Sequence, residues 1–212
     1  MSIIVAEKPK HKRDPISEGQ HIARMYLLCD VGTHYSERYD KSQHKLILGW
    51  EVPGERAQFT RDDGTEIDLP RAKYGWYTAS LGPKANLRKL LDQMRGKKFA
   101  PEELVGFEMK AVLGVPSLVQ ILHEAKEDGG IKDVLSAAMP LPKGMEAPAQ
   151  ENEFVWYDFD EHGLDIPENV YDWIADEIKS SDEYKALLGN GASAVADEPA
   201  PDFSEPDENL PF

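Results

Sequence analysis

Charge is distributed very unevenly along this chain of 212 residues. Residues 1–150 carry 22 Lys and Arg against 21 Asp and Glu, whereas residues 151–212 carry 2 against 18. A strongly acidic segment repels itself and buries too little apolar surface to offset the entropy that is lost on ordering. We therefore expect the main folded domain to lie in residues 1–150, and the net charge of −15 to arise in the last third of the chain.

Changes in composition predict how the chain is divided. Within the domain of residues 1–150, residues 1–20 are polar with two prolines, which indicates a flexible arm. Residues 151–188 are predicted to form an acidic appendage with aromatic and helical character. Residues 189–212 are rich in Gly, Ala, Ser, Pro and acids, which predicts a disordered tail.

Alternation of apolar and polar residues predicts a mainly β domain. Pro53-Gly54 and Arg61–Gly64 are expected to be turns between strands. The expected strands cover 21–35, 45–52, 58–60, 66–69, 74–81, 117–124 and 131–139. Trp50 shares a strand face with Leu46 and Leu48, which favours a place in the core.

Helical insertions are expected between the third and fourth strands of the domain. Residues 83–94 are predicted to form a helix that Gly96 ends, because their leucines and Met94 share one face. Shorter helical turns are expected at 101–104 and 107–113. This order is typical of an OB-fold-like five-stranded barrel, although other small β-barrels would give much the same pattern.

Basic residues gather in the stretch 71–98, where eight Lys and Arg accompany a single acid, Asp92. Lysine and arginine neutralise phosphates, and exposed aromatic rings stack on bases without a sequence code. Tyr74 and Trp76 lie on one face of their strand and Tyr77 on the other, so one set belongs to the core and the other can stack. The alternative interpretation of the basic stretch is an ordinary solvated helix face that binds no ligand.

The loop at 33–45 joins the first two strands, and the corresponding connection in an OB-fold closes over the ligand. An ordinary polar loop is the alternative reading. Together, the loop and the basic stretch predict a nucleic-acid-binding surface. Its members are Tyr35, Arg38, Tyr39, Lys41, Arg71, Lys73, Tyr74, Trp76, Lys84, Arg88, Lys89, Arg95, Lys97 and Lys98.

The segment 154–188 interleaves aromatic residues with acids. Its second part, Pro167–Leu188, is expected to be one amphipathic helix with an apolar face formed by Val170, Trp173, Ile174 and Ile178. Aromatic rings with carboxylates can imitate bases with phosphates, or they can pack against the barrel. Packing is the favoured interpretation.

Signals for catalysis are weak, and no catalytic residue, cofactor or metal ligand is predicted. The motifs for phosphate-binding loops, paired-cysteine zinc sites and zinc or serine hydrolases are not found in the sequence. The alternative to a protein without a metal site is that the acids between Asp158 and Asp165 bind a divalent cation. Cys29 is expected to be a buried small hydrophobe in a reducing cytoplasm. No membrane span is expected.

The chain ends on Asp207-Glu208-Asn209-Leu210-Pro211-Phe212, acids followed by an apolar residue, Pro and a terminal Phe. This tip resembles the C-terminal tip of bacterial single-stranded DNA-binding proteins, and the whole chain resembles a phage-type protein of this class. The resemblance implies non-catalytic coating of single-stranded DNA in replication or recombination, in the cytoplasm of a bacterial host. It also implies recruitment of replication or recombination proteins through Asp207, Glu208, Leu210, Pro211 and Phe212.

The resemblance does not extend to the segment 154–188, which the short bacterial tail lacks. The oligomeric state of the bacterial proteins therefore cannot be transferred directly to this chain, and a homo-oligomer is one alternative. Two other functions remain as alternatives. One is a nucleic-acid mimic that inhibits a basic host protein through residues 151–212. The other is a metal-dependent nuclease, or an accessory protein of one, that uses the acids at 158–165.

Overall fold

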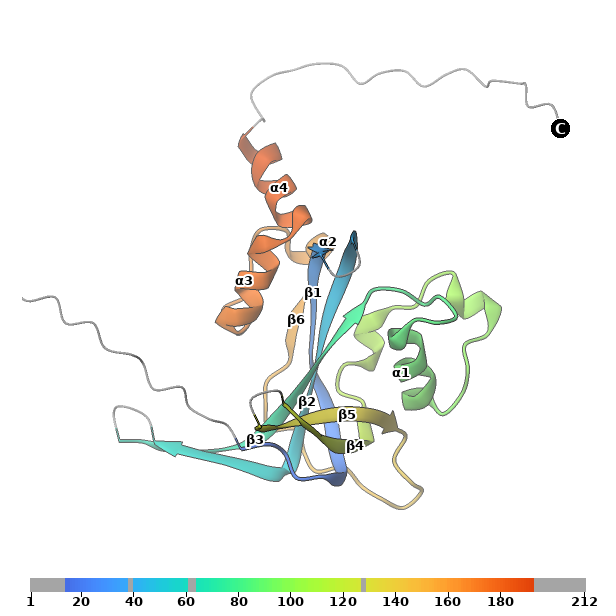
Figure 1. Cartoon of the computed structure of the whole chain (residues 1–212), viewed down its shortest axis with the longest axis vertical. Coiled ribbons are helices and arrows are strands. Elements are labelled where there is room, and N and C mark those ends of the chain that lie inside the picture. Colours follow the sequence, from blue (N-terminus) through green and yellow to red (C-terminus); the bar gives the residue numbers. More distant parts are fainter. Residues whose placement is uncertain (1–13, 38–39, 61–63, 127–128, 193–212) are drawn as a thin grey trace, which may run out of the picture.

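The structure, a computed structural model, describes residues 14–37, 40–60, 64–126 and 129–192. Five antiparallel strands form one sheet in the order β3-β2-β1-β4-β5, which curls into a half-barrel (Figure 1). The strands are β1 (Gly19–Ser36), β2 (Lys41–Thr60), β3 (Glu66–Thr78), β4 (Pro116–Ala125) and β5 (Ile131–Met139). The prediction of a mainly β domain with helical insertions is confirmed.

The helical insertion lies between β3 and β4, as predicted. It consists of α1 (Asn86–Arg95) and two 3-10 turns, η2 (Pro101–Leu104) and η3 (Met109–Val112). The apolar face of α1 is buried, and Gly96 ends the helix in the left-handed conformation with φ of 65°. Glycine adopts this conformation without the strain that a Cβ would cause. No helix in the described part of the chain is long and apolar enough to cross a membrane.

The two edge strands of the half-barrel are joined by an ion pair between Lys73 on β3 and Asp133 on β5, with 2.7 Å between Nζ and Oδ1. Burial alone would raise the pKa of Asp133, but hydrogen bonds from Lys73 and from the backbone N–H of Ile16 hold this pKa below its usual value. Ile16 itself is 2% exposed. The predicted flexible arm is therefore packed against the sheet at Ile16.

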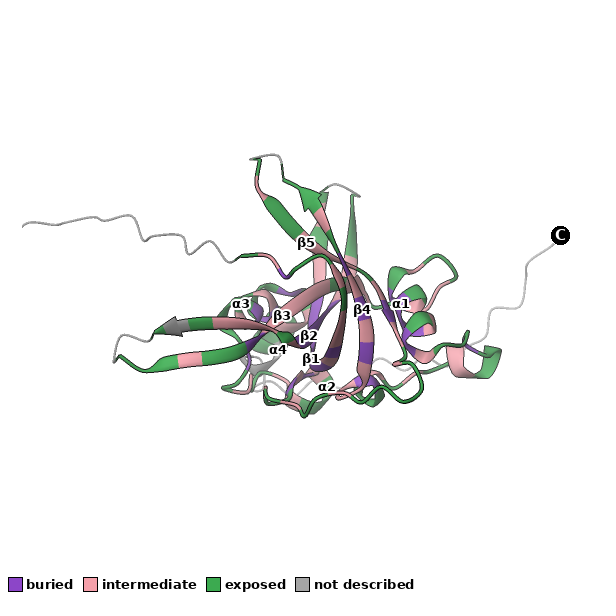
Figure 2. Ribbon diagram, turned by 90° about the horizontal axis from the view of Figure 1, so that it is seen from below, coloured by how far each residue is buried: buried purple, intermediate pink, exposed green. Residues whose placement is uncertain are grey.

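The expected turn at Pro53-Gly54 is wrong, because β2 runs on through these residues. The register of β2 against β3 shifts between Val52 and Arg56, which marks a bulge. A bulge accommodates proline in a strand because the ladder is already interrupted there. Beyond the bulge the two strands continue to the pair Thr60 and Glu66, as an arm whose far end is mostly exposed (Figure 2). The expected turn at 61–64 falls largely outside the described residues.

Hydrophobic cores form on both faces of the sheet. The inner core fills the half-barrel and contacts α1; its largest buried members include Trp50, Leu48, Met25, Leu91 and Ile121. The outer core covers the opposite face of β1 and β2, and its members are Tyr26, Leu27, Cys29, Val31, Ile47, Val155, Tyr157, Val170, Ile174 and Ile178. Burial raises the pKa of the Cys29 thiol to about 12, in keeping with the expected buried small hydrophobe.

The acidic C-terminal segment supplies half of the outer core, so the prediction that 154–188 packs on the barrel is confirmed. It contains β6 (Val155–Tyr157), α2 (Phe159–His162), α3 (Asp172–Ser180) and α4 (Asp182–Ala192). β6 pairs in parallel with β1, Leu27 opposite Val155. The predicted boundary at residue 150 therefore lies within a packed unit.

The single helix expected over 167–188 is instead two helices that meet at Ser181. Ser181 has an extended backbone, with ψ of 161°. Its hydroxyl accepts a hydrogen bond from the backbone N–H of Tyr184 at 3.1 Å and donates to the carbonyl of Ile178 at 2.7 Å. Ser181 thus ends α3 and caps α4, a role for which serine is strongly preferred.

A buried carboxylate fixes the start of the C-terminal segment. Glu51 on β2 is fully buried. Its Oε2 accepts hydrogen bonds from the backbone N–H of Asn152 at 2.8 Å and from the side-chain amide of the same residue at 2.9 Å. The backbone N–H of Glu151 lies 3.3 Å from Oε1. Glu51 therefore connects β2 to the C-terminal segment that supplies half of the outer core.

The start of α4 docks closely on β1. Glu183 accepts hydrogen bonds from the backbone N–H and the hydroxyl of Thr33, both at 2.6 Å. A Cβ built on Gly32 would lie 2.6 Å from Ser181 Cβ and from a Glu183 carboxylate oxygen, so only glycine allows this approach. His44 on β2 lies between two acids, with Nε2 2.6 Å from Asp30 and Nδ1 3.4 Å from Glu183.

This arrangement makes the docking of α4 sensitive to pH. The hydrogen bond to Asp30 raises the pKa of His44 despite partial burial, so its stabilising effect is complete below the ordinary histidine pKa and is lost as pH rises through the raised value. Hydrogen bonds from Thr33 lower the pKa of Glu183, although burial opposes them, so its effect is lost only as pH falls through that lowered value.

We expect the melting temperature of the protein to fall as pH rises from about 6 to about 9, and to fall less in His44→Gln, whose side chain does not titrate. Melting curves across this range test the expectation. Parallel curves for the two proteins would contradict it.

Candidate functional site

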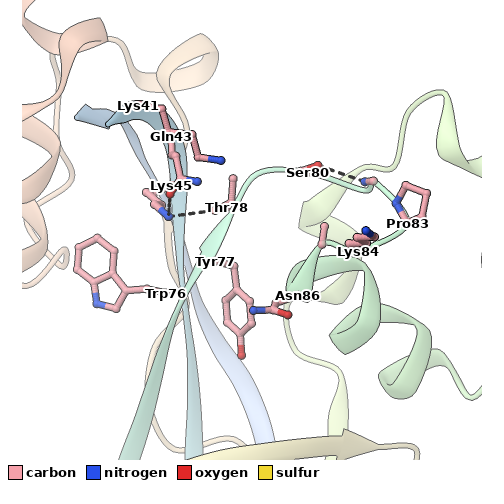
Figure 3. Close-up of a pocket in the computed structure, with 12 residues that line it drawn as sticks. Lys41, Gln43, Lys45, Trp76, Tyr77, Thr78, Ser80, Pro83, Lys84 and Asn86 are labelled. Carbon is pink, nitrogen blue, oxygen red and sulfur yellow. Dashed lines mark hydrogen bonds between the residues drawn. The ribbon is translucent and has the colours of Figure 1, made fainter. Parts of the chain in front are cut away.

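An open cleft of about 690 Å³ lies where the end of β3, the start of β2 and the loop into α1 meet (Figure 3). Lys45 is the register partner of Thr78, so the antiparallel pairing brings the two strand ends together. The backbone N–H of Ala79 extends the ladder by bonding to the carbonyl of His44 at 2.9 Å. The lining residues are Lys41, Gln43, Lys45, Trp76, Tyr77, Thr78, Ser80, Gly82, Pro83, Lys84, Ala85 and Asn86.

The cleft is positively charged. Lys41 and Lys45 come from β2 and Lys84 from the loop before α1, and none of the described lining residues carries a carboxylate. Lys45 Nζ donates to Gln43 Oε1 at 2.7 Å and to Thr78 Oγ1 at 3.0 Å. Burial, together with the nearby charge of Lys41, lowers the pKa of Lys45. An anion bound beside Lys45 would favour its charged form and so oppose both effects.

The aromatic residues of β3 divide between the two faces of the strand, as their alternation predicted. Tyr77 points towards Asn86 and packs against the inner core, and burial raises its pKa to about 12 (Figure 3). Trp76 points the other way, lines the cleft and is 47% exposed. Tyr74 packs against the outer core, with its hydroxyl 2.7 Å from that of Tyr26. Trp76 is therefore the stacking candidate that the cleft presents.

Three of the predicted basic residues lie outside the cleft and bind other parts of the fold. Lys73 pairs with Asp133, as described above. Arg95 pairs with Glu103, and its guanidinium lies 4.2 Å from the ring centre of Phe99. Arg71 donates to the carbonyl of Arg56 at 3.0 Å and also to that of Asp14. These three side chains therefore bind residues of the fold itself, and their sequence neighbours did not indicate these partners.

The other predicted residues that the structure describes are not among the lining residues of the cleft. Arg88 donates to the carbonyl of Leu81 at 3.3 Å, and Lys89, Lys97 and Lys98 are exposed on or just after α1. Tyr35 is exposed near the end of β1, and its hydroxyl donates to Asp40 at 2.5 Å. Arg38 and Tyr39 lie outside the described residues, as do Asp207, Glu208, Leu210, Pro211 and Phe212 of the tail.

Lys45 is a basic residue of the loop predicted at 33–45, but it, Gln43 and Asn86 are not among the members of the predicted surface. Gln43 and Lys45 flank His44 along β2, so their side chains lie on the face of the strand opposite to that of His44. The register that places them beside Thr78 is a property of the folded sheet, although alternation alone could have joined Lys45 to Lys41. Asn86 begins α1, and the predicted helix already contained it.

A second hollow of about 580 Å³ lies between η3 and α2. Lys110 Nζ is 4.9 Å from the ring centre of Trp156 and 2.8 Å from Glu161 Oε2, so this tryptophan is already covered by a cation. Asp158 accepts hydrogen bonds from the backbone N–H groups of Asp160 and Glu161 and thereby caps α2. Within the described residues, no three His, Cys, Asp or Glu side chains form a group that could hold a metal ion.

The sequence matches no protein-family model, and no curated protein matches it.

Proposed function

We propose that this protein binds single-stranded DNA without catalysis and coats it during replication or recombination. It would work as a phage-type single-stranded DNA-binding protein in the cytoplasm of a bacterial host. The observation that carries the proposal is the cleft, whose described lining includes three lysines and an exposed tryptophan and no carboxylate, in a chain of net charge −15.

The architecture supports an OB-fold. β1 pairs with both β2 and β4, β5 follows β4, and the helical insertion separates β3 from β4. The edges β3 and β5 are linked by the Lys73–Asp133 ion pair, as expected for a sheet that curls towards a barrel. OB-folds bind oligonucleotides on the face of their second and third strands and with the loop between the first two strands. The cleft lies on β2 and β3, beside Lys41 at the end of that loop.

The chemistry of the cleft supports a single strand over a duplex. A lysine neutralises a phosphate, and a tryptophan face stacks on a base only where the base is not already paired and stacked within a helix. Hydroxyl and amide groups of Thr78, Ser80 and Asn86 add neutral hydrogen-bonding groups that suit any base or phosphate. Binding with little sequence preference follows from these contacts.

The direct test is a titration of the full-length protein with single-stranded and duplex oligonucleotides at two salt concentrations. We expect preference for the single strand and an affinity that falls with salt, by a log–log slope of about −0.7 per neutralised phosphate. Equal affinity for the two forms, or no binding at low salt, would overturn the proposal.

Recruitment of replication or recombination proteins is proposed for the tail, through the acids and Phe212 at its tip. Deletion of Phe212 alone is expected to leave DNA affinity nearly unchanged, because it removes no acidic side chain that could compete with phosphate. Partner capture should fall sharply, because an aromatic anchor is a typical hot spot of an interface. Pull-downs of host replication proteins with the full-length and shortened chains test this. Equal capture by both would show that the tip is not a docking peptide.

A further inference from the structure

Two exposed tryptophans from distant parts of the chain lie side by side at the edge of the cleft. The rings of Trp76 on β3 and Trp173 on α3 have centres 6.5 Å apart and are tilted by 49°. They are 47% and 40% exposed. An exposed surface of adjacent aromatic residues is typical of an interaction site. We call Tyr74, Trp76, Tyr171 and Trp173 the aromatic patch.

The patch rests on a fixed base. Tyr74 forms T-shaped pairs with Trp173 and with Tyr171, whose ring centres lie 5.4 Å and 6.1 Å from its own. The buried hydroxyl of Tyr26 joins those of Tyr74 and Tyr171 at 2.7 and 3.0 Å. Burial raises the pKa of Tyr26, so this group stays neutral and its hydrogen bonds persist. Trp173 is therefore held in place by residues beneath it while part of its surface stays open.

We propose that Trp173 is a second base-stacking residue, so that the acidic C-terminal segment completes the DNA-binding surface. The inference rests on the proposed function, since it extends the same site. Trp76 belongs both to the cleft and to the aromatic patch, so a strand whose phosphates lie at Lys41, Lys45 and Lys84 can place one base on Trp76 and a neighbouring base on Trp173.

The charges on α3 determine which side of the strand faces the patch. Asp176 and Glu177 follow Trp173 by three and four positions, and residues at this spacing are neighbours on a helix surface. Carboxylates repel phosphates but not the faces of neutral bases. The lysines of β2 and the acids of α3 therefore orient the strand, with the backbone towards the cleft and the bases towards the helix.

The test compares Trp173→Ala, Trp76→Ala and wild-type protein, each at full length, with an oligo(dT) of about 20 nucleotides, longer than the site of one OB-fold. We expect each substitution to weaken binding by roughly 5- to 150-fold, the range that corresponds to one lost stacking contact. The salt slope should stay as in the wild type, because neither ring binds a phosphate. Val105→Ala, an exposed apolar residue outside the patch, is the control and should bind as the wild type does.

A fluorescence measurement guards against a trivial loss of fold. In the double variant Trp76→Phe, Trp156→Phe, the remaining tryptophans are the buried Trp50 and Trp173. Saturating oligo(dT) should quench the emission that Trp173 contributes. Wild-type binding that weakens in Trp76→Ala but not in Trp173→Ala, or binding without quenching, would overturn this inference alone. If the wild type does not bind the oligonucleotide, the proposed function itself fails.

Discussion

Replacing Lys41, Lys45 and Lys84 together by glutamine is expected to abolish most of the affinity for single-stranded DNA. If each lysine neutralises one phosphate, the log–log salt slope should become less steep by about 2, which is three contacts at about 0.7 each. The same relation predicts a loss of roughly 500-fold at about 50 mM salt and of roughly 30-fold at about 200 mM. Titrations at several salt concentrations give both quantities.

A matched control separates the cleft from the overall charge. Lys89, Lys97 and Lys98 are exposed and lie outside the cleft, so their replacement by glutamine changes the net charge equally. We expect this control to change affinity far less and to leave most of the slope. If both triple variants lose the same affinity, the cleft is not where the phosphates bind.

Replacing Glu51 by alanine is expected to lower the free energy of unfolding by roughly 3–5 kcal/mol. A hydrogen bond to a charged group contributes about 1.5–3 kcal/mol, and the substitution leaves the part-buried donors of Glu151 and Asn152 without this acceptor. The contributions share one acceptor group and do not add fully. Unfolding in urea, followed by tryptophan fluorescence, measures the loss.

Glu51→Gln is the matched variant, because it keeps the shape of the side chain and one acceptor oxygen. It should lose roughly half as much stability, since one oxygen is replaced by a donor that faces other donors. A loss below about 1 kcal/mol in the alanine variant would mean that water replaces the carboxylate and that this contact does not fix the C-terminal segment.

Local signals in the sequence were sufficient for most of the sheet and for α1. Alternation located β1, β4 and β5, and the apolar face with Gly96 located the helix and its end. Pro53-Gly54 misled because the same dipeptide serves a turn or a bulge, and the partner strand decides between them. Ser181 misled in the same way, since a serine within an amphipathic pattern becomes a cap only if the chain can bend onto β1.

The site was only partly predictable, because charge on a sequence does not reveal its partners in space. Lys73 and Asp133 are far apart along the chain but adjacent in the sheet, and Arg95 meets Glu103 through the turn η2. Trp76 was identified because its strand is rich in aromatics. Trp173 was assigned to packing because it follows an amphipathic pattern, and its position beside Trp76 depends on how α3 docks.

The outer core also has a consequence for how the chain is made. β1 is synthesised before the other described strands, yet its outer face is covered by residues of β6 and α3 that are about 130 to 150 positions later. At 5–20 residues per second, Leu27 and its neighbours wait on the order of ten seconds for Val155 and Ile174. A nascent chain thus exposes an apolar sheet face until its acidic segment emerges, and premature termination before that point leaves a product prone to aggregation.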